Sequence, residues 1–166
     1  MKRLLLTLLL LLPLSAFAQD SQKIAIVDAQ AILFEMPETK AMQTELDALK
    51  KKYEDTIATM RQELSKKYEE YVAQQDSLID TIKLRKQQDI QDVQKRIEDL
   101  MNIAAEDIQK KQMELLTPIQ KKLKDAIEKV GAENGYAYIL DAQMMHYVGT
   151  AGINCTPQVR TKLGLK

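Results

Sequence analysis

Residues 38–117 contain neither glycine nor proline and are bracketed by Pro37 and Pro118. Glycine and proline are the residues that most often interrupt helices, so this run of 80 residues permits unbroken helix throughout. It carries 14 basic and 17 acidic side chains. In its first half the apolar residues recur about every 3.6 positions, which predicts an amphipathic helix with a narrow apolar stripe. These positions are Met42, Leu46, Leu49, Tyr53, Ile57, Met60, Leu64, Tyr68 and Tyr71.

A second apolar stripe follows in the later part of the run and continues beyond Pro118. Between the two stripes the phase is lost at residues 73–77, and Ser77 with Asp80 has the spacing of a capping box that starts a new helix. We therefore predict an antiparallel hairpin with its tip near residues 74–80 and arms about 57 Å long. The positions of the returning stripe are Ile90, Val93, Ile97, Leu100, Ala104, Ile108, Leu115, Ile119, Leu123, Ile127 and Val130, with a polar gap at Gln112.

A single continuous helix is the alternative to a hairpin, since no residue of the run forbids it. Such a helix would leave its apolar stripe in water unless a second chain covered it. The hairpin is favoured because it buries the stripe within one chain. In either case a second arm or a second chain is needed to cover the apolar stripe.

The segments outside the run have the composition of short strands. Residues 23–28, 136–141 and 144–148 are rich in β-branched and aromatic side chains, and we expect a turn to join the last two. We also expect Gly131 and Gly135 to mark the end of the returning helix and the turn into the next strand.

Two short helices are predicted near these strands. Asp28 is a candidate cap for a helix over residues 29–35, which Pro37 would end by forcing Met36 out of the helical region. Thr156 followed by Pro157 supplies a cap and a first-turn proline for a last helix that ends at Gly164.

The fold class is therefore mainly α with a small β body, in which a long antiparallel helical hairpin, residues 38–117, is inserted between residues 19–37 and 118–166. These two body segments are too short to bury a generous core alone. We expect the body to oligomerise through its strands. The candidate oligomerisation residues are Ile24, Ile26, Tyr136, Tyr138, Leu140 and Tyr147.

Residues 1–18 match a secretory signal peptide. Lys2 and Arg3 precede a leucine-rich run over residues 4–12, and residues 16–18 read Ala-Phe-Ala, so we expect cleavage after Ala18. The apolar run is about half the length that spans a bilayer. The mature chain is therefore predicted to be exported.

The charged and reactive residues argue against catalysis and against nucleic acid. The chain has 24 basic and 24 acidic side chains, whereas binding to phosphates is dominated by Lys and Arg. His146 has no second His or Cys to share a metal, and the lone Cys155 reads as a buried small apolar residue or as a thiol that pairs with another chain. We expect no enzyme activity, no metal and no cofactor.

The order of these segments resembles the Skp (OmpH) family of periplasmic chaperones. The resemblance rests on the motifs Lys-Ile-Ala-Ile-Val-Asp at 23–28 and Tyr-Ala-Tyr-Ile-Leu-Asp-Ala at 136–142, on the charged hairpin between them and on the short last helix. It covers essentially the whole mature chain. It implies a homotrimer in which three helical tentacles project from a β body and enclose a cavity.

The same resemblance implies a function in the biogenesis of outer-membrane proteins. The family holds unfolded outer-membrane β-barrel proteins in the periplasm without ATP and prevents their aggregation. A structural coiled-coil protein of the cell envelope is the alternative, but it would not need the strand-forming ends. Well-known members are strongly basic, whereas this chain has a pI of about 6.6, so its charge does not favour contact with lipopolysaccharide or a membrane.

Two further groups of residues are predicted to act in client binding and arm movement. Apolar residues crowd near the expected tip, where a holdase would present surface to a client. Pro37 and Pro118 lie at the base of both arms, where they are candidates for a hinge or for a fixed kink. The candidate client-binding residues are Tyr68, Tyr71, Val72, Leu78, Ile79 and Ile82.

Overall fold

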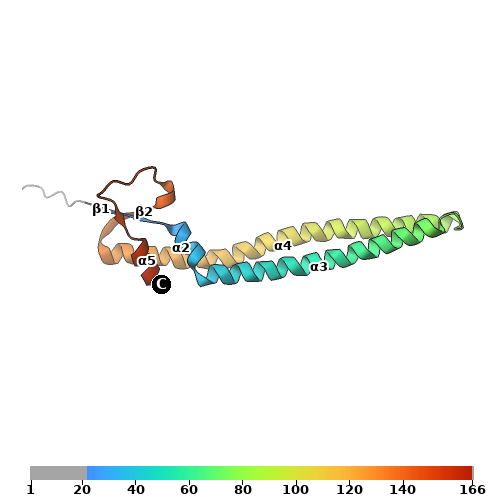
Figure 1. Cartoon of the computed structure of the whole chain (residues 1–166), viewed down its shortest axis with the longest axis horizontal. Helices are drawn as coiled ribbons and strands as arrows, with labels where there is room; N and C mark the ends of the chain where they lie inside the picture. Colours follow the sequence, from blue (N-terminus) through green and yellow to red (C-terminus); the bar gives the residue numbers. More distant parts are fainter. Residues whose placement is uncertain (1–21, 166) are drawn as a thin grey trace, which may run out of the picture.

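A computed structural model describes residues 22–165 and shows a small body from which one long helical hairpin projects (Figure 1). The body contains three strands and two short helices, and the hairpin is made by the two long helices. In chain order the elements are β1 (Lys23–Val27), α2 (Ala29–Glu35), α3 (Pro37–Gln74), α4 (Asp80–Asn134), β2 (Tyr136–Asp141), the 3₁₀ helix η2 (Ala142–Met144), β3 (Ile153–Asn154) and α5 (Thr156–Leu163).

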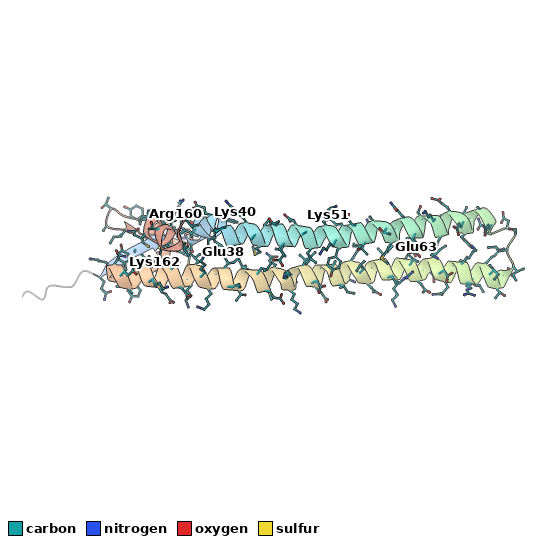
Figure 2. The ribbon with its side chains drawn as sticks, turned by 90° about the horizontal axis from the view of Figure 1, so that it is seen from below. Glu38, Lys40, Lys51, Glu63, Arg160 and Lys162 are labelled. Carbon is teal, nitrogen blue, oxygen red and sulfur yellow. The ribbon has the colours of Figure 1, made fainter. Side chains whose placement is uncertain are left out.

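The hairpin is antiparallel, and its two arms lie side by side in both views (Figures 1 and 2). Residues 75–79 connect α3 to α4, so the predicted tip is confirmed and the single continuous helix is wrong. The apolar stripes of the two arms face each other and form the seam between α3 and α4. In the tip half of α4 the seam contains the buried side chains of Ile90, Val93, Ile97 and Ala104.

The capping box predicted at the tip does not form. Helix α4 begins at Asp80 with Ile79 as its N-cap, and no side chain caps it. The Ser77 hydroxyl instead donates to the carbonyl of Gln74, 2.9 Å away. The expectation failed because Ser77 satisfies a free carbonyl at the end of α3, one of the groups that a helix C-terminus leaves unpaired.

The three strands form one parallel sheet in the order β2-β1-β3. Ala25 of the central strand pairs with Ile139 on one side and with Ile153 on the other. The whole hairpin therefore forms the connection between β1 and β2. Parallel neighbours require such a long crossover, whereas antiparallel strands can be joined by a short turn.

The strand predicted at 144–148 is wrong, and the third strand is Ile153–Asn154 instead. The Asp141 carboxylate accepts a hydrogen bond from the backbone N–H of Gln143, 2.9 Å away, and the chain turns into η2. Because β3 is parallel to β1 and lies on the opposite side of it from β2, the chain must travel back along the sheet first. Residues 145–152 make that return.

The base of α4 packs into the body and supplies much of its core. Ile119, Leu123, Ala126 and Val130 of this helix lie in one buried cluster with side chains of β1, α2 and α5. Helix α4 continues through Pro118, so this proline does not end the helix. Arm and body therefore share one helix of 55 residues.

The caps of the body helices agree only in part with the sequence. Asp28 caps α2 as predicted, since its carboxylate accepts from the N–H of Ala31 at 2.9 Å, and Met36 is extended. Helix α4 ends at Gly135, whose φ is 65°, and not at Gly131. Gly131 lies inside the helix, where a Cβ would approach the Ile139 side chain to 3.3 Å, so the glycine leaves room for this side chain of β2.

The last helix, α5, begins at Thr156, whereas a cap at Thr156 would have started it at Pro157. Its N-cap is Cys155, and Thr156 is its first residue, while Gly164 ends it with a φ of 74°. Thr156 does not cap α5 because its hydroxyl accepts from the N–H of Asp28, 3.0 Å away. This bond ties the start of α5 to the end of β1.

We predict that Gly135→Ala lowers the free energy of unfolding by about 1 kcal/mol, because a residue with a Cβ is strained at positive φ. Gly135→Asn should cost less, since Asn tolerates the left-handed region. Chemical denaturation at fixed protein concentration measures both. Gly149→Ala is the control, because a Cβ there makes ordinary contact with Tyr147 at 3.6 Å; equal costs at the two glycines would contradict the argument.

Candidate functional site

The end of the hairpin carries a group of exposed apolar side chains, which we call the tip surface: Tyr68, Val72, Ile79, Ile82 and Leu84. Ile79 is 71% exposed and Leu84 is 66% exposed. The seam between the arms does not cover these side chains, and the body lies at the opposite end of the hairpin (Figure 1). Exposed apolar side chains gathered at one end of an element are candidates for a surface that binds a partner.

Two of the six predicted client-binding residues are less exposed than the other four. Tyr71 is half-buried, and its hydroxyl accepts from the side-chain amide of Gln87 on the other arm at 2.6 Å. Leu78 is also half-buried. Tyr68, Val72, Ile79 and Ile82 are exposed at the surface.

Leu84 was missed as a candidate. It lies on α4 outside the apolar spacing that defines the seam, between Lys83 and Arg85. A large apolar residue out of phase with the stripe of its own helix is a sequence signal for exposure. Met101, Ile103 and Met113 show the same signal farther down the arm, where they are between 46% and 61% exposed.

The sheet has one covered face and one open face. Ala25 and Val27 point into the buried cluster, so Ile24 and Ile26, which alternate with them, point to the other side. The register places Tyr138 beside Ile24 and Leu140 beside Ile26. We call these four residues the open sheet face, in which Tyr138 is 58% exposed.

The returning segment after η2 extends this apolar surface. Ile24, Ile26, Met145, Tyr147 and Val148 line an open groove of about 480 Å³ beside β1. Tyr147, one of the predicted oligomerisation residues, is 82% exposed. Exposed Met144 and Val148 were not singled out from the sequence, because a regular strand over residues 144–148 was expected there.

Tyr136 differs from the other predicted oligomerisation residues. It is half-buried and packs against the buried cluster of the body. The shift of register between Lys23 and Ile24 separates Tyr136 from the regular pairing of β2 with β1. Ile24, Tyr138, Leu140 and Tyr147 are thus exposed and Ile26 is half-buried, whereas Tyr136 packs against the core.

Polar contacts link the two arms near their base. Lys122 of α4 pairs with Glu38 of α3, and Lys111 pairs with Glu45 at 2.7 Å. In Figure 2, Glu38 and Glu63 point from α3 toward α4, whereas Lys51 points away. Pro37 is the first residue of α3 and Pro118 lies inside α4, so the two predicted hinge residues are near these contacts.

Cys155 is fully buried, and His146 is exposed in the segment after η2. Burial raises the pKa of the Cys155 thiol, which favours the unreactive protonated form. Its burial agrees with the interpretation of this residue as a small apolar side chain. Among residues 22–165 no three His, Cys, Asp or Glu side chains are grouped as metal ligands would be.

None of the helices in this part of the chain is both long and apolar enough to cross a membrane. The predicted signal peptide, residues 1–18 with cleavage after Ala18, lies outside the described residues.

Comparison with known proteins identifies the family. The sequence profile of the family described as Outer membrane protein (OmpH-like) matches residues 23–163. The chain belongs to the OmpH-like family. The match includes β1, the hairpin, β2, β3 and α5, so it covers both the arm and the body.

Two relatives of this OmpH-like chain agree with the assignment. Chaperone protein Skp of Pectobacterium atrosepticum is 22% identical over 142 residues, which are 86% of each chain. A crystal structure from Caulobacter crescentus, of a protein described as OmpH-like, has a TM-score of 0.76 at 13% identity. That comparison covers 86% of this chain and 83% of the other, and it shows that the two share a fold.

The ion pair of Glu38 with Lys122 predicts a dependence of stability on pH. The hydrogen bond from Lys122 holds the pKa of Glu38 below its usual value of 4.5. The pair therefore stabilises the fold fully above pH 4.5, and this contribution is lost as the pH falls through the lower pKa of the folded state.

We expect Glu38→Gln to unfold more easily than the wild-type protein at neutral pH, with a difference that shrinks below pH 4.5. Denaturant titrations at a series of pH values measure it. Glu70→Gln, at an exposed position near the end of α3, is the control for loss of one negative charge. A difference for Glu38→Gln that is the same at every pH would contradict the pairing.

Proposed function

We propose that this chain is an ATP-independent periplasmic holdase, which binds unfolded outer-membrane proteins between helical arms and prevents their aggregation. The observation that carries the proposal is the tip surface, which presents apolar side chains at the end of an arm of an OmpH-like protein. The relative from Pectobacterium atrosepticum, the chaperone protein Skp, supports chaperone activity. The signal-peptide pattern of residues 1–18 supports a periplasmic location.

The physical requirements of a holdase agree with this surface. Such a protein must cover apolar segments of many clients without fitting one sequence, so adaptable apolar side chains on an accessible element suit it. The tip surface combines aliphatic side chains with the ring of Tyr68. Their burial against a client would be favourable by roughly 25 cal/mol per Å². No nucleotide or metal is needed for binding of this kind.

We further infer that the protein is a homotrimer assembled through its bodies. The open sheet face and the groove beside β1 place apolar side chains of two strands and the returning segment in one exposed region. A region of this kind on a small body is expected to be covered by other copies. Three arms around a common axis would then enclose the cavity for the client.

The native mass of the mature protein tests both proposals at once. We expect a trimer that takes up one chain of an unfolded outer-membrane barrel protein, seen by native mass spectrometry or light scattering. A trimer that ignores the client would support the assembly and count against the holdase. A monomer or dimer without client binding would favour the alternative, a structural coiled-coil protein of the envelope.

Replacing Ile79 and Leu84 together by Ser should weaken client binding. Each aliphatic side chain contributes about 1.5 kcal/mol when fully buried, so we expect the apparent Kd to rise at least about tenfold. Suppression of client aggregation and fluorescence titration measure the effect. Met113→Ser is the control, because Met113 is 61% exposed on the arm away from the tip; equal losses for the two variants would count against a special role of the tip.

Replacing Leu140 by Glu should prevent assembly, because the open sheet face would bury an unpaired carboxylate in the interface. We expect a shift from trimer to smaller species in light scattering at micromolar concentration. Gln62→Glu adds the same charge to an exposed position on the arm and should leave the mass unchanged. An unchanged mass for Leu140→Glu would place the interface elsewhere.

A further inference from the structure

Polar contacts join α3 and α4 at intervals along the whole seam. In nearly every one of them, a donor or a cation on one arm meets an oxygen atom on the other, which is the acceptor that such groups bind best. The contacts with an oxygen acceptor are, from base to tip, Lys122 with Glu38, Lys111 with Glu45, Tyr53 with Asp107, Arg96 with Glu63 and Gln87 with Tyr71.

Between the contacts of Tyr53 and Glu63, the arms meet through a sulfur atom instead. The Nη2 atom of Arg61 on α3 lies 3.9 Å from the Sδ atom of Met101 on α4. A guanidinium carries five N–H donors, whereas a thioether sulfur is a weak acceptor. Within residues 22–165 this guanidinium forms no ion pair. Its contact across the seam is therefore with the weakest acceptor of the series.

Met101 is accessible to small reagents in solution. Its side chain is 46% exposed, whereas that of Met36 in the body is 1% exposed. Exposed methionine is oxidised to the sulfoxide, a change that methionine sulfoxide reductases reverse. The oxygen of a sulfoxide carries partial negative charge, so a guanidinium donates to it more strongly than to sulfur. Oxidation thus supplies the kind of acceptor that the other contacts of the seam already have.

The reaction with a peroxide balances without a further reactant. The sulfur of Met101 attacks one peroxide oxygen, so that an S–O bond forms and the O–O bond breaks. The sulfur loses two electrons, and the peroxide gains them. The proton of the transferred oxygen moves to the departing hydroxide, which leaves as water. The product is a sulfoxide on the atom that already contacts Arg61.

We propose that Met101 is a site of reversible oxidation, whose sulfoxide accepts a hydrogen bond from Arg61 and so completes the polar contacts across the seam. Oxidation at this residue strengthens the seam, whereas methionine oxidation usually disrupts apolar packing. Met113 is the matched site without this effect. It is 61% exposed on the same helix, and no side chain of the described residues donates to its sulfur.

Amide hydrogen exchange before and after treatment with hydrogen peroxide tests the proposal, with peptide mass mapping to locate the added oxygen. We expect Met101 and Met113 to be oxidised before the buried Met36. The backbone amides of residues 97–104 should then exchange about three- to tenfold more slowly, as a hydrogen bond to a charged group predicts. The slowing should persist in Met113→Leu and be absent in Met101→Leu.

Arg61→Ala separates the new hydrogen bond from other effects of oxidation. It should abolish the slowing, whereas Arg85→Ala, at an exposed arginine near the tip, should keep it. Met101→Gln places an amide oxygen on a side chain of similar length, so it should slow exchange without any peroxide. Met113→Gln should not. These two glutamine variants decide the matter even if peroxide modifies other methionines.

Unchanged or faster exchange at residues 97–104 after oxidation of Met101 would overturn the proposal. Equal slowing in Arg61→Ala would do the same, as would a Met101 that stays reduced while Met113 is oxidised. No client is present in these measurements. Their outcome is therefore independent of the proposed holdase function.

Discussion

The burial of the base of α4 in the body is the constraint on which the rest of the structure depends. Val130 and Leu123 pack in the same cluster as Ala25 of β1 and Val159 of α5. Because the same helix continues into the arm, its direction is set by the core of the body. Helix α3 packs against α4 along the seam. The length of the two helices therefore sets the distance between the body and the tip surface.

The sequence predicted the hairpin because its signals are local and repeated. The spacing of Leu46, Ile97 and similar residues recurs over many turns, so one exception such as Gln112 does not hide the pattern. Gly135, Gly164 and the Asp28 cap were also readable, since each acts within a few residues. The covered and open faces of β1 follow from simple alternation once the strand is known.

Several failures came where partners that are distant in the sequence determine the structure. Thr156 does not cap its helix because its hydroxyl accepts from Asp28, more than a hundred positions earlier. The third strand at Ile153–Asn154 is only two residues long and owes its existence to pairing with β1. At the tip, the different exposure of Tyr71 and Val72 likewise depends on how the arms meet. Tyr71 is half-buried and bonds to Gln87 of the other arm, whereas Val72 is exposed.

The parallel pairing of β1 with β2 has a consequence for how the chain folds. Ile26 of β1 pairs with Leu140 of β2. The central strand β1 therefore precedes the hairpin in the sequence, and its partner β2 follows the hairpin. Helices and their hairpins form from local contacts and are fast, whereas pairing between distant strands is slow. The hairpin is thus expected to form first and to bring β1 and β2 together. The arm therefore helps the body to fold, in addition to presenting the tip surface.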